Sequence, residues 1–142
     1  MSRIRKTILC IDDQWSGLIS RKMFLENHGY IVLEATGGDE GLKIFQTHRI
    51  DAVILDYQMP GMNGDVVATR MKRARPDIPI LLLSAYGPLP DNKLQSVDRF
   101  LTKSQEPKAL LPALQHLLYG QPKPFFSRWF ENWRGRNQGA QR

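Results

Sequence analysis

The stretch ILCIDD, residues 8–13, is an apolar run that ends in two adjacent acidic residues. Its Ile and Leu content and its length are typical of a short strand that is covered on both faces. Neighbouring carboxylates repel each other and resist burial, so we expect Asp12 and Asp13 in a solvent-facing loop. The stretch by itself leaves two interpretations open: a polar turn after a strand, or part of a cation site.

The composition is that of a globular protein. Hydrophobic residues make up 42% of the 142-residue chain and charged residues 24%, so one domain with a short appendage is expected. No apolar stretch approaches the ~20 residues of a membrane span, and the apolar segment after the basic N-terminus is too short for a secretory signal. We therefore predict a cytoplasmic protein. The single cysteine, Cys10, lies inside the apolar run and is expected to be a buried, unreactive thiol.

Positive charge is concentrated at the C-terminal end. The net charge is +6, and residues 121–142 hold five Lys or Arg against one Asp or Glu. The preceding part is nearly balanced, so the high pI describes the end of the chain more than its domain. The sequence divides into a domain over 1–120 and a basic, aromatic-rich tail over 121–142.

Strand-like and helix-like segments alternate along the domain. Short runs rich in Ile, Val and Leu predict strands at 7–12, 31–35, 51–56, 79–84 and 98–103. Helical spacing of apolar residues predicts helices at 15–28, 38–48 and 64–74. This alternation indicates a parallel sheet with helices on both faces.

Prolines make two helices harder to place. The last helix is expected to begin near Ser104 as N-cap, with Pro107 in its first turn, and to run to about Tyr119. Pro112 lies inside this segment and should kink the helix or delay its start. Between the fourth and fifth strands, two prolines and a glycine leave room only for a short helix near 91–97.

Polar residues stand at the ends of four predicted strands. Asp12 and Asp13 end the first strand, Asp56 the third, Ser84 the fourth and Lys103 the fifth. Ligands of open parallel sheets bind at the carboxyl ends of the strands. We therefore expect three carboxylates, a hydroxyl and an ammonium group to share one edge.

This set of groups suits a divalent cation and a phosphoryl group. Three converging carboxylates repel unless a cation lies among them, and hard oxygen ligands favour Mg²⁺ over zinc. Asp13 and Asp56 would bind the ion directly, and Asp12 mainly through water. Asp56 is the candidate nucleophile, because a carboxylate can accept a phosphoryl group as an aspartyl phosphate. Lys103 and Ser84 would contact the phosphoryl oxygens, although each alone is also an ordinary strand-end residue.

Four motifs together carry a family resemblance: DD after the first strand, D-x-x-MPGMNG after the third, SAY after the fourth and FLTK at the fifth. Over about residues 5–120 the chain resembles the receiver domain of two-component response regulators. The resemblance implies a flavodoxin-like (CheY-like) doubly wound α/β fold, with five parallel strands in the order 2-1-3-4-5. It also implies a stand-alone response regulator in a phosphorelay.

The resemblance assigns a role to each position. The phosphoacceptor maps to Asp56, the acidic metal pocket to Asp12 and Asp13, and a further metal ligand to the backbone carbonyl of Gln58. The family's active-site lysine maps to Lys103. Its two switch residues, a hydroxyl and an aromatic side chain, map to Ser84 and Phe100. Read from the residues alone, Phe100 can equally be ordinary core.

The resemblance also implies a mechanism and partners. A histidine kinase or phosphotransfer protein would donate the phosphoryl group, and the receiver would catalyse only its own phosphorylation and dephosphorylation, on Mg²⁺. The switch pair would then bias the surface formed by the fourth helix, the fifth strand and the last helix toward an unknown downstream protein.

Some positions depart from the family pattern. Ser104 follows the lysine where a proline in a cis peptide is common, and the segment from 84 to 103 is short and lacks the usual GA-x-D-Y stretch. Gln58 and Tyr86 stand where they would affect water access. A degenerate receiver that acts as an unphosphorylated scaffold therefore stays open. An aspartyl-phosphate phosphatase is disfavoured, because Gln58 takes the place of its second acid.

The tail is too short for a standard DNA-binding output domain. After a Pro-containing linker, its aromatic residues fall at spacings that gather on one face of a helix: Phe125, Phe126, Trp129, Phe130 and Trp133. Packing on the domain or homodimerisation is favoured for this stripe, ahead of docking to a partner protein. Membrane-surface and nucleic-acid contacts are disfavoured.

Overall fold

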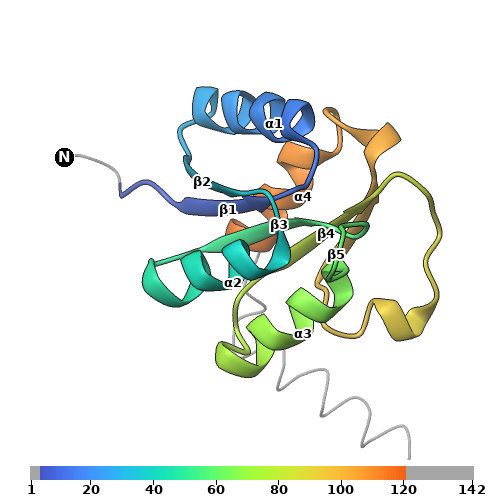
Figure 1. Cartoon of the computed structure of the whole chain (residues 1–142). Coiled ribbons are helices and arrows are strands. Elements are labelled where there is room, and N and C mark those ends of the chain that lie inside the picture. Colours follow the sequence, from blue (N-terminus) through green and yellow to red (C-terminus); the bar gives the residue numbers. More distant parts are fainter. Residues whose placement is uncertain (1–3, 121–142) are drawn as a thin grey trace, which may run out of the picture.

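The computed structural model describes residues 4–120, which form a five-stranded, all-parallel sheet in the order β2-β1-β3-β4-β5 (Figure 1). The strands are β1 (Thr7–Ile11), β2 (Ile31–Ala35), β3 (Ala52–Asp56), β4 (Ile80–Ser84) and β5 (Arg99–Thr102). This is the predicted flavodoxin-like order. The predicted tail, residues 121–142, lies outside the described residues.

Helices cover both faces of the sheet. They are α1 (Trp15–Asn27), α2 (Gly38–Thr47), α3 (Gly64–Ala74) and α4 (Leu110–Tyr119). Helices α1 and α4 pack on one face, and α2 and α3 pack on the other, as Figure 1 shows. Within residues 4–120, no helix combines the length and apolar character needed to cross a membrane.

The central strands β1, β3 and β4 are apolar except at an end residue, because their side chains alternate between two cores. Along β1, Ile8 and Cys10 belong to the core beneath α1 and α4, whereas Leu9 and Ile11 belong to the core beneath α2 and α3. All four are fully buried, as expected for a strand covered on both faces. The prediction of a buried cysteine is confirmed, because Cys10 is fully buried. This burial raises the pKa of its thiol to about 12.

The last helix begins later than predicted. Lys103–Gln105 form a separate 3₁₀ turn, η2, in which Thr102 and Gln105 make a reciprocal capping box. Helix α4 starts at Leu110, so Pro112 lies in its first turn, where its missing N–H costs no hydrogen bond. Pro112 thus delays the start of the helix, and the prediction of Ser104 as its N-cap was wrong.

The segment between β4 and β5 contains less helix than predicted. Only Asp91–Lys93 form a 3₁₀ turn, η1, in place of a short helix over 91–97. The segment is held to α3 by an ion pair between Lys93 and Asp65, with 3.4 Å between Nζ and Oδ2, and by a hydrogen bond between the Thr69 and Ser96 hydroxyls. The implied output surface therefore has no α-helix between β4 and β5, whose connection the structure describes in full.

The strand register brings the predicted site residues to one edge. Ile11 pairs with Leu55, so the residues that follow them, Asp12 and Asp56, stand at the same level on neighbouring strands. Ser84 pairs with Thr102, which places Lys103 one step beyond the end of β5. The site therefore follows from the register of the buried strands.

Gly64 allows α3 to start close against the end of β3. A Cβ atom at this position would collide with the backbone carbonyl of Asp56 and would lie 2.9 Å from Cδ1 of Leu82. The Gly64 N–H donates to the carbonyl of Tyr57 at 2.7 Å. Because Gly64 has no side chain, the start of α3 can lie this close to Asp56, and the loop between them can close with the Gly64–Tyr57 hydrogen bond.

We predict that Gly64→Ser lowers the free energy of unfolding by about 1–3 kcal/mol, the usual range for overpacking. Gly37→Ser is the matched control, because a Cβ there meets no atom within 4 Å and Ser is a favoured N-cap residue. Urea unfolding of both variants measures the difference. Equal stability of the two variants would contradict the close-packing account.

Candidate functional site

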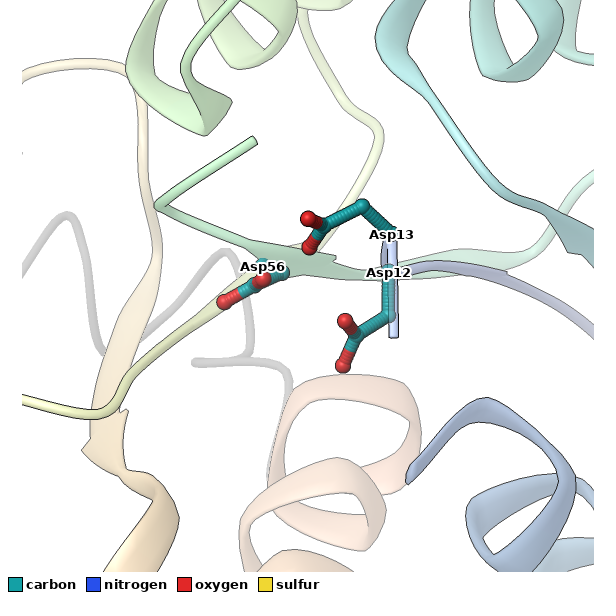
Figure 2. A group of neighbouring side chains, drawn as sticks. All are labelled: Asp12, Asp13 and Asp56. Carbon is teal, nitrogen blue, oxygen red and sulfur yellow. The ribbon is translucent and has the colours of Figure 1, made fainter. Parts of the chain in front are cut away.

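Three carboxylates meet at the carboxyl edge of the sheet. Asp12, Asp13 and Asp56 each offer an oxygen, and these oxygens lie within 4.8 Å of one another (Figure 2). Asp12 and Asp56 are 0% and 3% exposed, whereas Asp13 is exposed. The predicted convergence of these acidic groups is thus found in the structure.

Asp12 is fully buried and receives hydrogen bonds on both oxygens. Its Oδ1 accepts the backbone N–H of Gln14 at 2.9 Å. Its Oδ2 accepts from Nζ of Lys103 at 3.2 Å and from Nη1 of Arg21 at 3.3 Å. Burying an ionised carboxylate is costly unless it is paired, and here two cations and a backbone donor provide the pairing.

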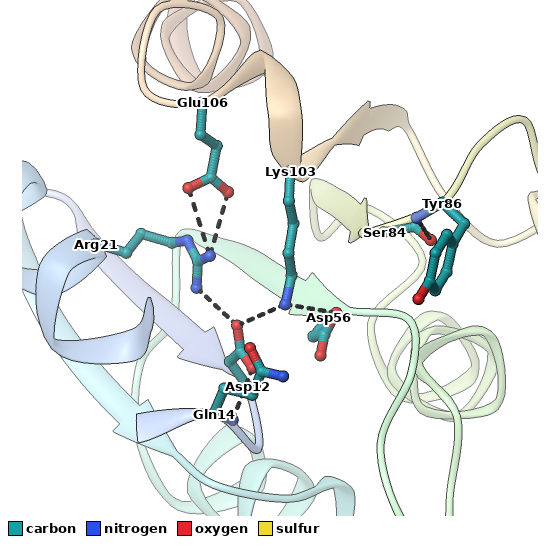
Figure 3. A network of polar contacts seen from close by, with 8 residues as sticks. All are labelled: Asp12, Gln14, Arg21, Asp56, Ser84, Tyr86, Lys103 and Glu106. Atoms are coloured by element: carbon teal, nitrogen blue, oxygen red, sulfur yellow. Dashed lines mark hydrogen bonds and ion pairs between the residues drawn. The ribbon is translucent and has the colours of Figure 1, made fainter. Parts of the chain in front are cut away.

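Lys103 bridges two of the acids. Its Nζ lies 3.3 Å from Oδ1 of Asp56 as well as 3.2 Å from Oδ2 of Asp12 (Figure 3). The lysine follows directly after β5, so the end of this strand aims its charge at the ends of β1 and β3. Lys103 therefore sits where it can contact a group attached to Asp56.

A pocket of about 390 Å³ opens above these residues. Its lining is mostly polar and comes from four loops: Asp13, Gln14, Asp56, Gln58, Met59, Pro60, Asn63, Ala85 and Lys103. Asp12 is not among the lining residues. Asp13 and Asp56 thus face the pocket and Asp12 does not line it, and their roles toward a metal ion stay predictions.

The surroundings of Asp56 disfavour its charged form. Burial is the largest cause that raises the pKa of Asp56, and the Asp12 charge adds to it, while Lys103 opposes both; the resulting pKa is about 7. Closely spaced hard oxygen donors whose charges repel one another fit a small divalent cation such as Mg²⁺. The residues present therefore suit the ion that the sequence implied.

The two predicted switch residues lie beside the pocket rather than in it. Ser84 is buried, and its Oγ accepts the backbone N–H of Tyr86 at 3.1 Å. Phe100 is partly buried against the core beneath α2 and α3, and a Cβ at Gly87 would lie 3.4 Å from its ring. Ser84 stands on β4, the neighbour of β3, whereas Phe100 stands on β5, one strand further from Asp56. Their switch roles stay predictions.

Sequence reasoning missed two charged residues behind the site, Arg21 and Glu106. The Arg21 side chain is 3% exposed and its Nη2 lies 3.2 and 3.4 Å from the two carboxylate oxygens of Glu106, while its Nη1 contacts Asp12 (Figure 3). A signal was present, because Arg21 falls in register with Leu18 and Leu25 on the buried face of α1. A charge within an apolar stripe calls for a buried partner.

Similarity to known proteins identifies the family of this chain. The chain matches the family model described as response regulator receiver domain over residues 8–115, and it belongs to that family. It is 31% identical over 134 residues to the transcriptional regulatory protein GlrR of Escherichia coli. The aligned region covers 92% of this chain and 30% of GlrR. The chain spans about half the length of several other curated relatives that it matches.

Solved structures give the same result. The response regulator protein TrrA of Thermotoga maritima, determined in complex with Mg²⁺–BeF, is 33% identical with a TM-score of 0.76, over 80% of this chain and 99% of that one. TrrA determined in complex with the histidine kinase ThkA is similar, with 34% identity and a TM-score of 0.75, over 80% and 98% of the two chains. The fold prediction and the family resemblance are therefore confirmed.

The pKa of Asp56 predicts a pH-dependent effect of Asp56→Asn on stability without divalent ions. The pKa of Asp56 is about 7 in the folded protein and 3.8 in the unfolded chain. Between these values the folded protein holds a proton that the unfolded chain has released, so the wild type loses stability progressively from about pH 4 to about pH 7. Asparagine avoids this cost. The melting temperature of the variant minus that of the wild type should rise with pH over this window and level off above it.

Thermal unfolding in a chelator between pH 4 and pH 8 measures this difference. The attraction of Lys103 for ionised Asp56 is already part of this pKa, and packing changes made by the substitution add an offset that does not depend on pH. A difference that stays constant from pH 4 to pH 8 would contradict the raised pKa of Asp56.

Proposed function

We propose that this chain is a phosphoryl-accepting receiver of a phosphorelay, with Asp56 as the acceptor. The observation that carries the proposal is the position of Asp56 in the polar pocket, in contact with Lys103 and within 4.8 Å of two further carboxylates. Membership of the receiver family supports it. The similar response regulator TrrA, determined with a histidine kinase, supports a histidine kinase or phosphotransfer protein as the donor.

The chemistry proposed for Asp56 is a transfer between two side chains. A carboxylate oxygen of Asp56 attacks phosphorus and forms the new P–O bond, while the P–N bond of a donor phosphohistidine breaks and its electron pair stays on the imidazole nitrogen. Water later attacks the aspartyl phosphate, which releases inorganic phosphate and restores the carboxylate. The chain then acts on no substrate other than its own phosphoryl group.

Lys103 and Ser84 would hold the transferred group. The Lys103 ammonium lies 3.3 Å from Asp56 and can move onto a phosphoryl oxygen with little displacement. The Ser84 hydroxyl can donate to another oxygen while its own oxygen still accepts the N–H of Tyr86. Hydrogen bonds between a charged donor and an anionic oxygen are among the stronger ones, so the aspartyl phosphate would be held in one orientation.

The same pocket would bind Mg²⁺. Asp13, Asp56 and the backbone carbonyl of Gln58 would hold the ion directly, and Asp12 would act through water. When bound, the ion would supply positive charge that favours ionised Asp56 and reduces repulsion between the carboxylate and the incoming phosphoryl group. The complex of TrrA with Mg²⁺–BeF supports this assignment.

The proposed output is a change of surface rather than a reaction on a substrate. The new charge on Asp56 would draw Ser84 toward the phosphate and allow Phe100 to move inward, which shifts the population of two packings. Because the segment after β4 forms only the η1 turn, the responding surface would consist of this segment, β5 and α4. The downstream partner would be a protein, and a cytoplasmic location stays a prediction.

Phosphoryl uptake from acetyl phosphate tests the acceptor. With Mg²⁺ present, we expect intact-mass spectra of the wild type to show one added phosphoryl group, and Asp56→Asn to show none. Asp77→Asn is the matched control, because it removes an exposed carboxylate outside the pocket. It should be modified like the wild type.

Two results would overturn the proposal. Equal modification of Asp56→Asn and wild type would remove Asp56 as the acceptor. No modification of the wild type, either by acetyl phosphate or by a set of phosphorylated histidine donors, would favour the unphosphorylated scaffold instead.

A further inference from the structure

A chain of charged contacts continues from the pocket into the interior between α1 and α4. It runs from Asp56 through Lys103 to Asp12, then through Arg21 to Glu106 (Figure 3). The first three residues belong to the proposed phosphoryl site. The last two belong to neither the pocket lining nor the implied receiver machinery, so they need their own explanation.

Arg21 divides its charge between two acids. Nη1 faces Oδ2 of Asp12 at 3.3 Å, whereas Nη2 spans both oxygens of Glu106 at 3.2 and 3.4 Å. Burial lowers the pKa of Arg21, but Glu106 and Asp12 raise it above its ordinary value. The guanidinium is therefore a permanent positive charge whose pull on Asp12 is reduced by Glu106.

The same Asp12 oxygen also contacts Lys103. A cation in the pocket is attracted by the negative charge of these carboxylates. Every other positive charge close to Asp12 reduces that attraction, and so competes with the bound cation. Arg21 is thus a fixed competitor of a bound cation, and Glu106 weakens that competitor. The two residues act on the site from behind, without reaching the pocket.

We propose that Arg21 is a positioning residue that sets the Mg²⁺ affinity of the acidic site through Asp12, and that Glu106 tunes its effect. This inference rests on the proposed function, because it concerns the same metal site. Arg21 also stabilises Asp12 when Lys103 turns toward a phosphoryl group, since Asp12 then keeps one cationic partner. Glu106 lies three residues after Lys103, so the segment that follows β5 is tied to the state of the pocket.

The proposal predicts opposite effects for two variants that break the same ion pair. Arg21→Gln removes the competing charge, so Mg²⁺ should bind about threefold to tenfold more tightly, the order of magnitude for one charge behind a pocket whose solvent screens it. Glu106→Gln leaves Arg21 to act on Asp12 alone, so Mg²⁺ should bind more weakly by a similar or smaller factor. Both variants should be less stable, because each leaves a buried charge with one partner fewer.

Two further variants separate charge from geometry. Arg21→Lys keeps the positive charge and loses the planar group that contacts Asp12 through Nη1 and Glu106 through Nη2. Its Mg²⁺ affinity should therefore stay within about twofold of wild type by the same electrostatic reasoning. The double variant Arg21→Gln/Glu106→Gln changes two opposite charges and should return the affinity close to the wild-type value. Calorimetric titration of the full chain with MgCl₂, without any phosphoryl donor, measures all five proteins.

The outcomes separate this inference from the proposed function. Opposite shifts for the two single variants, with return in the double variant, support it. Shifts of the same sign would mean that the two residues act only through stability, and unchanged affinities would mean that Arg21 has no influence on the site; either result overturns it. If wild type binds no Mg²⁺, the metal part of the proposed function fails first, whereas normal binding with unshifted variants defeats this inference alone.

Discussion

The repulsion among three carboxylates at the end of a buried sheet is the constraint on which the rest of the structure depends. Asp12 and Asp56 are brought together by the register of β1 and β3, and Asp13 follows directly. The fold does not relieve this repulsion by exposing the acids, since two of them are buried. It supplies positive charge instead, from Lys103 on one side and Arg21 on the other.

This arrangement explains how stability and chemistry are linked. A carboxylate with a pKa near 7 is poorly solvated and close to a like charge, so a cation or a phosphoryl group with its counter-ions improves its surroundings. In the proposed function, filling the site would recover part of the stability lost by burying the acids. Because Lys103 contacts both Asp12 and Asp56, the proposed phosphoryl group on Asp56 would act on the contacts of Asp12 and on the segment after β5.

The sequence predicted the fold and the pocket because both follow from local patterns. Apolar runs marked the strands, and their alternation with helices indicated the parallel sheet. The carboxyl ends of parallel strands meet at one edge of the sheet, which placed Asp12, Asp56 and Lys103 together. Arg21 was missed because its buried position depends on Glu106, 85 residues away in the chain. The start of α4 and the replacement of a helix by the η1 turn depend on how prolines fit against the packed sheet, which spacing alone does not reveal.

The most direct measurement of the central claim is the chemical location of the phosphoryl group. Borohydride reduces an acyl phosphate to an alcohol, which converts a phosphorylated aspartate into homoserine. Peptide mass spectrometry after phosphorylation and reduction should place homoserine at position 56. Homoserine at position 12 or 13 instead, or a phosphoryl group that resists reduction and maps to a histidine or serine, would contradict the account.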